Sequence, residues 1–323
     1  ERFDHRVERH AEQGRLLGIA LHRDRLPRSV ARLAGERRVR RDDAELLLPR
    51  EGVAETRAAR DYYAIYPADE AEVKQEGKEE KDLVGYVHSY EVGSTVDGPG
   101  LRFVAFLTGC LLRCQFCHNP DTWHLHNGHP ITVSRAMAQI AKYAKVLKIS
   151  KGGVTLSGGE PMVQKPFVTR IFRHCKELGL HTCIDTSGRL GDRMTDAELM
   201  DIDLHLLDIK SGDPDTYKKI TNQPLQPTLD YARRLSALGR PMWVRFVLVQ
   251  GLSDDYDNVE KVADVCAELK SLERVEILRF HQMGREKWHK LGLSYPLENV
   301  EPPDAALTER VRGQFRSRGL TVY

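Results

Sequence analysis

The chain of 323 residues carries 49 basic and 47 acidic side chains, and 41% of its residues are hydrophobic. At about 150 residues per domain, this length fits two domains or one large α/β barrel, and it can bury a core without disulfide or metal cross-links. No apolar run approaches the about 18–20 residues of a membrane span. A net charge of +2 argues against a dedicated nucleic-acid binder, whose surface is strongly basic.

Residues 1–84 differ in composition from the rest of the chain. Residues 1–50 hold thirteen Arg, no Lys and nine acidic residues, whereas residues 51–84 hold five basic and ten acidic residues. Such a composition is typical of poorly ordered segments. A small helical module is one alternative, and a transit peptide is another, although the many acidic residues argue against it. We expect a charge-rich extension here and one domain over residues 85–323.

From Gly85 onward, apolar strand-like runs alternate with helix-like stretches. The runs that we interpret as strands are Arg102–Leu107, Gly153–Leu156, His181–Ile184, Asp203–Leu207, Met242–Val249 and Val275–Leu278. Alternation of strands and helices predicts right-handed βαβ units and a parallel sheet. The predicted fold class is therefore α/β, with the sheet open or closed into a partial barrel.

Three amphipathic stretches between these strands predict helices. Thr132 can cap the first, whose apolar stripe lies within Met137–Leu147. The second stripe lies within Phe167–Leu178, and Gly179 is placed to end that helix. The third stripe lies within Val259–Leu269.

Three cysteines lie within eight residues after the first of these strands. Cys110, Cys114 and Cys117 have the spacing C-x3-C-x2-C, and soft thiolate ligands select zinc, copper(I) or iron–sulfur clusters. Structural zinc normally has four protein ligands, and the nearest candidate for a fourth, His118, adjoins Cys117 directly. Three thiolates on a 4Fe–4S cluster instead leave one iron free to bind a ligand. A zinc site, a redox-thiol site and three incidental thiols are the alternatives.

The segment Cys110–His118 resembles the cluster motif of the radical S-adenosylmethionine (SAM) superfamily, with the aromatic Phe116 before its third cysteine. Further segments resemble those of the pyruvate formate-lyase-activating enzymes. They are Ser94–Gly100, Cys117–Trp123, Ser157–Pro161, Asp185–Gly188, Leu207–Lys210, Trp243–Arg245 and Phe280–Gly284. The resemblance covers essentially all of residues 85–323 and none of residues 1–84.

The resemblance implies a partial (β/α)6 barrel with parallel strands. It implies that Cys110, Cys114 and Cys117 hold one 4Fe–4S cluster whose unique iron binds SAM. Reductive cleavage of SAM then gives a 5′-deoxyadenosyl radical, which removes a hydrogen atom from a backbone glycine in a loop of pyruvate formate-lyase. Because the cofactors perform this chemistry, no side chain is expected to act as a general acid or base.

Glycine or polar residues follow several of the predicted strands, and in a parallel barrel such strand ends converge on one mouth. Gly158 and Gly159 allow a ligand to approach the backbone closely, and by resemblance they bind the amino group of SAM. The resemblance implies contacts between the SAM cofactor and a larger set of residues. These are Phe116, Cys117, His118, Gly158, Gly159, Glu160, Asp208, Ile209, Lys210, Arg245 and His281.

A monovalent cation beside SAM is also implied by the resemblance. Its ligands would be Asp185, Thr186 and Asp208, with a backbone carbonyl from Leu206. Arg245 lies in an otherwise apolar strand, where a charge is costly unless it is paired. We expect its partner to be either a structural Asp or Glu or the carboxylate of the ligand.

Two residues are implied in contacts with the protein substrate. Asp97 would meet the incoming glycine loop, although an Asp in this position is also a common turn former. Trp123 could shape the same surface, with packing in the core as its alternative.

The expected partners are pyruvate formate-lyase and a low-potential electron donor, flavodoxin or ferredoxin. We also expect a monomer and a reducing, cytoplasmic location. An activating enzyme for another glycyl radical enzyme is one alternative. Many of those insert a Cys-rich segment after the first motif, whereas no cysteine lies between His118 and Ser157. A non-catalytic iron–sulfur or zinc-binding regulator is another, and it gives no role to Lys210 or His281.

Overall fold

The computed structural model describes residues 83–323. The extension predicted over residues 1–84 lies outside the described residues except at its last two positions, Leu83 and Val84. Leu83 is buried in the core, and Val84 begins the first described strand. In this part of the chain, no helix is long and apolar enough to cross a lipid bilayer.

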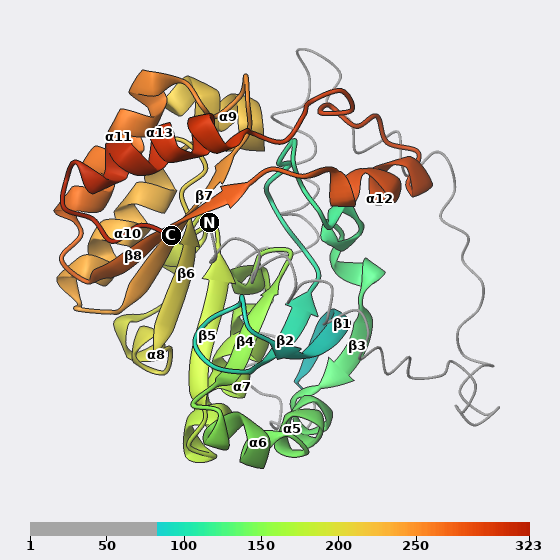
Figure 1. The fold of residues 1–323 in the computed structure, drawn as a ribbon. Helices are drawn as coiled ribbons and strands as arrows, with labels where there is room; N and C mark the ends of the chain where they lie inside the picture. Colours follow the sequence, from blue (N-terminus) through green and yellow to red (C-terminus); the bar gives the residue numbers. More distant parts are fainter. Residues whose placement is uncertain (1–82) are drawn as a thin grey trace. The chain divides into compact units, whose positions relative to one another are not determined.

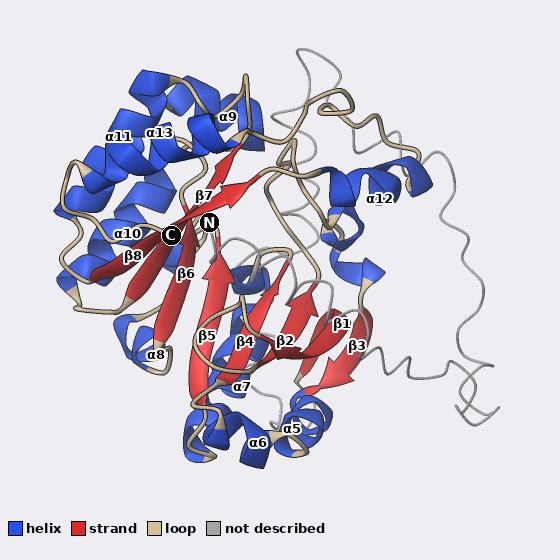
Figure 2. Ribbon diagram, viewed as in Figure 1, coloured by secondary structure: helices blue, strands red, loops and turns tan. Residues whose placement is uncertain are grey.

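An eight-stranded sheet forms the centre of the described chain (Figure 1 and Figure 2). Its strands are β1 (Val84–Ser94), β2 (Arg102–Leu107), β3 (His129–Thr132), β4 (Gly153–Gly158), β5 (His181–Thr186), β6 (Leu204–Asp208), β7 (Met242–Leu248) and β8 (Leu272–Arg279). The spatial order is β3-β1-β2-β4-β5-β6-β7-β8. The last six strands in this order are parallel, and β1 is antiparallel to both of its neighbours.

The sheet is open, because within residues 83–323 its edge strands β3 and β8 do not pair with each other. The predicted α/β partial barrel with six parallel strands is therefore confirmed. Each of the six predicted strand runs overlaps one of these parallel strands. Strands β1 and β3, which extend the sheet beyond β2, were not predicted.

Helices connect the strands and cover the outer face of the sheet (Figure 2). The α-helices are α5 (Val133–Ala141), α6 (Ala144–Ile149), α7 (Lys165–Glu177), α8 (Asp196–Met200), α9 (Pro214–Thr221), α10 (Gln226–Ala237), α11 (Tyr256–Glu268), α12 (Arg285–Lys290) and α13 (Ala305–Arg316). Short 3-10 helices are η2 (Pro120–Thr122), η3 (Leu125–Asn127), η4 (Pro161–Gln164), η5 (Gly191–Arg193) and η6 (Gln282–Gly284).

The structure confirms the predicted start of α5 at Thr132 and the predicted end of α7 before Gly179. The Thr132 side chain caps α5 by accepting a hydrogen bond from the backbone N–H of Arg135 at 3.4 Å. Gly179 follows α7 with a φ of +65°, the left-handed conformation that ends helices. The apolar stripe predicted within Met137–Leu147 is divided between α5 and α6.

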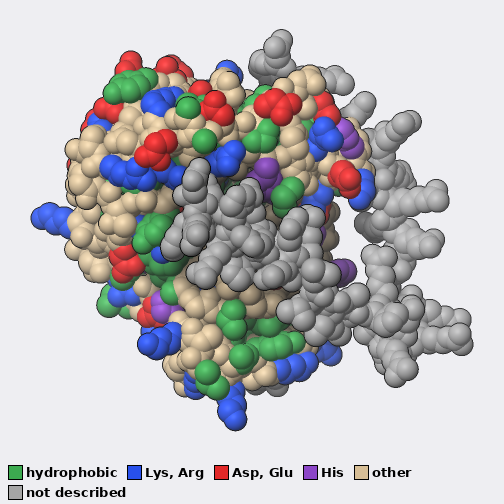
Figure 3. All heavy atoms as spheres, viewed as in Figure 1, with side chains coloured by type: hydrophobic (Ala, Val, Ile, Leu, Met, Phe, Trp, Pro, Cys, Tyr) green, Lys and Arg blue, Asp and Glu red, His purple; other side chains and the backbone are tan. Residues whose placement is uncertain are grey.

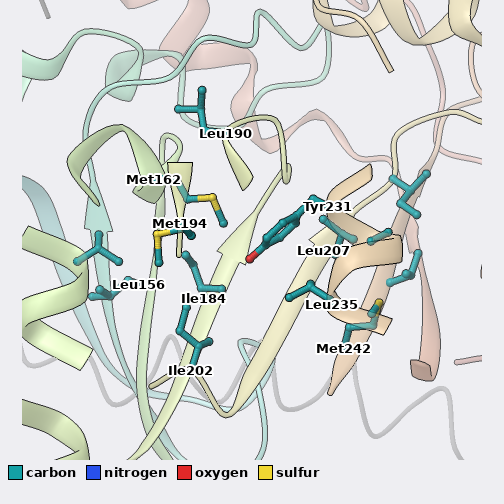
Figure 4. Close-up of a cluster of buried hydrophobic side chains, with 14 of the residues drawn as sticks. Leu156, Met162, Ile184, Leu190, Met194, Ile202, Leu207, Tyr231, Leu235 and Met242 are labelled. Carbon is teal, nitrogen blue, oxygen red and sulfur yellow. The ribbon is translucent and has the colours of Figure 1, made fainter. Parts of the chain in front are cut away.

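The main hydrophobic core lies between the sheet and the outer helices, and Figure 4 shows part of it. The residues labelled there are Leu156, Met162, Ile184, Leu190, Met194, Ile202, Leu207, Tyr231, Leu235 and Met242. Cys175 and Cys266 are fully buried in this core, and Cys183 is fully buried in a smaller apolar cluster on β5 to β7. These three cysteines therefore pack in the interior.

A second apolar cluster brings the C-terminal part of the chain against the cysteine segment. Its buried members are Leu112, Cys114, Phe116, Trp123, Ile220, Val249, Phe280, Trp288, Leu293, Tyr295 and Leu297. Cys110 and Cys117 pack against this cluster and are partly buried. The segment after β8 thus encloses one side of the cysteine loop.

On the visible face, basic and acidic side chains of the described residues are interspersed (Figure 3). This distribution agrees with a net charge of +2 for the whole chain. It differs from the single-sign basic surface of a nucleic-acid binder.

Candidate active site

The cysteine loop follows β2 and is tied by backbone hydrogen bonds to two other segments. The N–H groups of Gly109 and Cys110 donate to the carbonyls of Thr122 and Trp123 at 2.8 and 3.0 Å. On the other side, the N–H of Gln115 donates to the carbonyl of Ile220 in α9 at 3.0 Å. These bonds fix the backbone of the loop independently of any bound metal.

The three thiols of the loop are free, and burial raises the pKa of each of them. The pKa of Cys114 rises to about 12. For Cys117, hydrogen bonds from the backbone of Asn119 and the side chain of Trp123 oppose the effect of burial. Buried thiols of this kind become thiolates when a metal binds them.

The described residues contain no three His, Cys, Asp or Glu side chains placed to hold a single metal ion. The ligands of an iron–sulfur cluster bind different iron atoms and need not converge on one point. Three free, soft sulfur donors on one loop therefore fit such a cluster.

The glycine turn after β4 is in direct contact with the cysteine loop. The N–H of Gly159 donates to the carbonyl of Leu107, and the N–H of Glu160 donates to the carbonyl of Gly109, at 2.8 and 2.7 Å. A Cβ on Gly159 would lie 2.3 Å from the Gly109 oxygen, and one on Gly158 would lie 2.4 Å from the Leu107 nitrogen. Both glycines are therefore required by the packing of β4 against β2.

The carboxylate of Glu160 joins the ends of β4 and β5. It accepts hydrogen bonds from the Thr186 hydroxyl at 2.7 Å, from the Ser187 N–H and hydroxyl at 2.9 and 2.5 Å, and from the Met162 N–H at 3.3 Å. Burial raises its pKa, and these hydrogen bonds oppose the rise. The side chains of Glu160 and Thr186, predicted to bind SAM and a cation, are already bonded to their own chain.

Three charged side chains predicted at strand ends lie together. The Lys210 ammonium is 2.7 Å from the Asp208 carboxylate and 5.4 Å from the centroid of the Phe116 ring. Burial acts to lower the pKa of Lys210, but Asp208 and Cys114 outweigh it, so the pKa rises and the side chain stays protonated. Burial raises the pKa of Asp185 to about 6, and Asp208 adds to the rise.

Arg245 has structural carboxylates as partners. Its Nη1 atom is 3.5 Å from Asp185 Oδ1, and its Nε atom is 3.1 Å from Glu276 Oε2. Burial acts to lower the pKa of Arg245, and the two carboxylates raise it further than burial lowers it. We considered either a structural Asp or Glu or the carboxylate of the ligand as the partner of Arg245. The structure provides the first, as Asp185 and Glu276.

The rings of His118 and His281 stack with their centroids 4.3 Å apart. Burial lowers the pKa of both imidazoles, that of His118 to about 4, so both are neutral near pH 7. Within residues 83–323, the buried Nδ1 atom of His281 has no hydrogen-bond partner. Because a buried polar atom without a partner is costly, this nitrogen is suited to a ligand beside the cysteine loop.

The two residues predicted to contact substrate differ in their surroundings. The Asp97 side chain accepts a hydrogen bond from the Ser94 hydroxyl at 2.5 Å, and its carbonyl accepts one from Thr155 at 2.6 Å, as expected for a turn former. Trp123 is 5% exposed and packs edge-on against Trp288, with ring centroids 5.1 Å apart. Trp123 thus packs in the core, which was the alternative to a role at the substrate surface.

Residues after β8 also shape the site, and most of them were not predicted. The Trp288 indole N–H donates to the Cys117 carbonyl at 2.8 Å, and the Lys287 ammonium donates to the Asn119 amide oxygen at 2.8 Å. A Cβ on Gly284 would lie 2.9 Å from the Cys117 carbonyl oxygen. Of these three residues after β8, only Gly284 lay in a segment that the sequence analysis named, Phe280–Gly284, which also contains the predicted His281.

The model of the Radical SAM superfamily matches residues 104–264. The crystal structure of Streptococcus suis SuiB bound to precursor peptide SuiA shares the fold, with a TM-score of 0.51 and 18% identity over 68% of this chain and 46% of that chain. The fold and the cysteine loop thus define a radical SAM enzyme, a class that uses a 4Fe–4S cluster and SAM.

More similar relatives narrow the class. The pyruvate formate-lyase-activating enzyme of Staphylococcus epidermidis is 47% identical over 241 residues, which are 72% of this chain and 95% of the relative. The enzyme of the same name from Staphylococcus aureus strain USA300 is 44% identical with the same coverage. The chain belongs to the family of pyruvate formate-lyase-activating enzymes, and the resemblance noted in its motifs is confirmed.

Proposed function

We propose that this enzyme activates pyruvate formate-lyase by cleaving SAM reductively and removing a hydrogen atom from a backbone glycine of that protein. The observation that carries the proposal is the contact between a loop with three free thiols and the glycine turn after β4. This contact lies in a chain that is 47% identical to an activating enzyme over 95% of that relative.

In this proposal Cys110, Cys114 and Cys117 hold the 4Fe–4S cluster. When bound, the cluster supplies the low-potential electron for cleavage of the SAM sulfonium. The protein keeps water away from this reaction with the apolar cluster that encloses one side of the loop, including Phe116 and Trp288.

The same proposal assigns the binding of SAM to groups around the loop. The carbonyl groups of the Gly158–Gly159 turn suit an ammonium group, and the protonated Lys210 suits a carboxylate or a polar oxygen. The His281 Nδ1 atom, which has no partner within residues 83–323, suits a hydrogen-bonding group of the ligand, as donor or acceptor according to the tautomer of the imidazole. The Asp185 and Asp208 carboxylates suit a monovalent cation, which would offset the repulsion that adds to the raised pKa of Asp185.

The remaining partners are also part of the proposal. Flavodoxin or ferredoxin would reduce the cluster, because cleavage of SAM needs a low-potential electron. Asp97 would meet the glycine loop of the protein substrate. We also propose that the enzyme is a monomer. We place it in the cytoplasm, since free cysteine thiols persist in a reducing compartment.

The test is anaerobic reconstitution of the enzyme with iron and sulfide, followed by addition of SAM, a reductant and pyruvate formate-lyase. We expect a glycyl radical signal on pyruvate formate-lyase in electron paramagnetic resonance, together with 5′-deoxyadenosine. A mononuclear metal site, or a reduced cluster that leaves SAM intact, would overturn the proposal.

A further inference from the structure

The guanidinium group of Arg245 joins three parts of the barrel. Its Nε atom lies 3.1 Å from Glu276 Oε2, and its Nη1 atom lies 3.5 Å from Asp185 Oδ1. Its Nη2 atom donates a hydrogen bond to the backbone carbonyl of Val96. A guanidinium is rigid and planar, so its three nitrogens move together and contacts at two of them fix its orientation.

Two of these contacts lead to different functional regions. Asp185 is the penultimate residue of β5 and lies near Asp208, in the region assigned to the cofactor. Val96 lies in the loop between β1 and β2, next to Asp97, which is assigned to the substrate. Arg245 therefore connects the cofactor region to the substrate-facing loop through a single side chain.

Glu276 is well placed to control the orientation of Arg245. The two residues are paired across the adjacent parallel strands β7 and β8. The other carboxylate oxygen of Glu276 accepts a hydrogen bond from Arg274, whose guanidinium lies over the Trp243 ring. The Glu276 side chain is thus itself held in place from a second direction.

Glu276 offsets the charge of Arg274, and it also contacts Arg245. A buried guanidinium needs carboxylate or hydrogen-bond partners in good geometry, and Asp185 provides a first carboxylate near Arg245. Glu276 contacts Nε, the nitrogen on the opposite side of the group from the Asp185 contact, and so fixes its rotation.

We propose that Glu276 is a positioning residue that orients Arg245, so that one guanidinium holds both the Asp185 carboxylate and the Val96 carbonyl. Glu276 thereby sets the position of the substrate-facing loop, residues 94–100, relative to the cofactor region. This inference rests on the proposed function, because that function gives the loop its substrate.

The test compares Glu276→Ala and Glu276→Gln with the control Glu273→Gln. Glu273 lies on the same strand and accepts a hydrogen bond from the Trp243 indole at 2.7 Å. A Gln at this position can still accept that bond, so the Trp243 ring and the Arg245 contacts stay in place. The first measurement is amide hydrogen exchange over residues 94–100 in the protein without cofactors. We expect exchange about tenfold faster in Glu276→Ala, a smaller increase in Glu276→Gln, whose amide oxygen still accepts, and no change in the control.

The second measurement is the KM for a glycine-loop peptide of pyruvate formate-lyase with the reconstituted enzyme. We expect Glu276→Ala to raise this KM about tenfold with a smaller effect on kcat. A lower melting temperature with wild-type loop exchange and wild-type KM would indicate a merely structural role and overturn the inference. If Glu276→Ala does not fold, the test compares loop exchange and KM between Glu276→Gln and Glu273→Gln. Equal values in these two variants overturn the inference.

The two levels of the proposal fail in different ways. Absence of a glycyl radical with the wild-type enzyme contradicts the proposed function and leaves the exchange measurement intact. An active wild type with no difference between Glu276→Ala and Glu273→Gln contradicts only the positioning role.

Discussion

The imidazole rings of His118 and His281 stack at 4.3 Å, with an angle of 28° between their planes. His118 directly follows the last cysteine of the loop, and His281 comes two residues after the end of β8. The stack therefore connects the cysteine loop to the far edge strand of the parallel sheet, and it leaves the Nδ1 atom of His281 for a ligand.

Replacing His281 by Phe keeps a ring for this stack but removes both ring nitrogens. We expect the variant to fold and to assemble its cluster, and to bind SAM about tenfold more weakly because one hydrogen bond is lost. Calorimetric titration of SAM into the reconstituted protein measures the change. An unchanged affinity would show that His281 only packs.

Replacing Cys114 by Ala removes one of the three sulfur donors. We expect loss of the 4Fe–4S absorption and of SAM cleavage, since each donor holds a different iron. The matched control is Cys266→Ala, a fully buried cysteine in the main core, which should keep its iron. Iron content and formation of 5′-deoxyadenosine measure the outcome, and an active Cys114→Ala protein would refute the ligand assignment.

Replacing Gly159 by Ala places a methyl group 2.3 Å from the Gly109 carbonyl oxygen. The β4 turn and the cysteine loop must then separate, and we expect a destabilisation of about 1–3 kcal/mol together with impaired binding of SAM. The control is Gly313→Ala in α13, where a Cβ meets nothing within 4 Å and better helix propensity favours the folded state by up to about 1 kcal/mol. Urea unfolding measures both changes, and equal effects would contradict the steric argument.

Replacing Trp288 by Phe removes the hydrogen bond to the Cys117 carbonyl while keeping an aromatic ring. We expect iron to be lost several-fold faster to a chelator, since one hydrogen bond contributes about 1 kcal/mol. Tyr295→Phe is the control from the same apolar cluster, because the buried Tyr295 hydroxyl has no partner in the described residues. Similar rates for the two variants would rule out this role of the indole.

Stability should fall as the pH decreases from about 7 toward 4. Burial lowers the pKa of His205 to about 3 and that of His181 to about 4, so below about 6.5 the unfolded chain takes up protons that the folded chain does not. Asp185 acts in the opposite direction, because burial raises its pKa to about 6 and folding favours its protonated form. The two histidines lower the stability over the wider pH range, because their pKa values lie at about 3 and 4 in the folded chain, whereas Asp185 has a pKa of about 6. Urea midpoints at several pH values test this, and His205→Gln should reduce the slope; an unchanged slope would contradict it.

The parallel part of the sheet could be predicted because its strands are buried on both faces and show continuous apolar runs. In β2, five of the six residues are buried. Strand β1 could not be predicted in this way, because Val84–Ser94 is largely exposed and its pairing with β2 has two irregular positions. Its pairing partners, rather than its own residues, make it a strand.

The site was predictable where a local motif carries it. Cys110 and Gly159 belong to short segments of distinctive composition that follow strands, and the structure brings those segments into contact. The contacts of Glu276 and Trp288 depend on pairing between distant segments and leave no local pattern. The sequence likewise could not show which carboxylates pair with Arg245, because Asp185 on β5 and Glu276 on β8 become its neighbours only in the folded sheet.

The support that Trp288 gives to Cys117 has a consequence for biosynthesis. The two residues are 171 positions apart, so the cysteines leave the ribosome long before the indole that closes over them. Delivery of iron and sulfide to a nascent chain would meet a loop that lacks this closing contact. We therefore expect stable maturation of the metal centre to follow completion of translation.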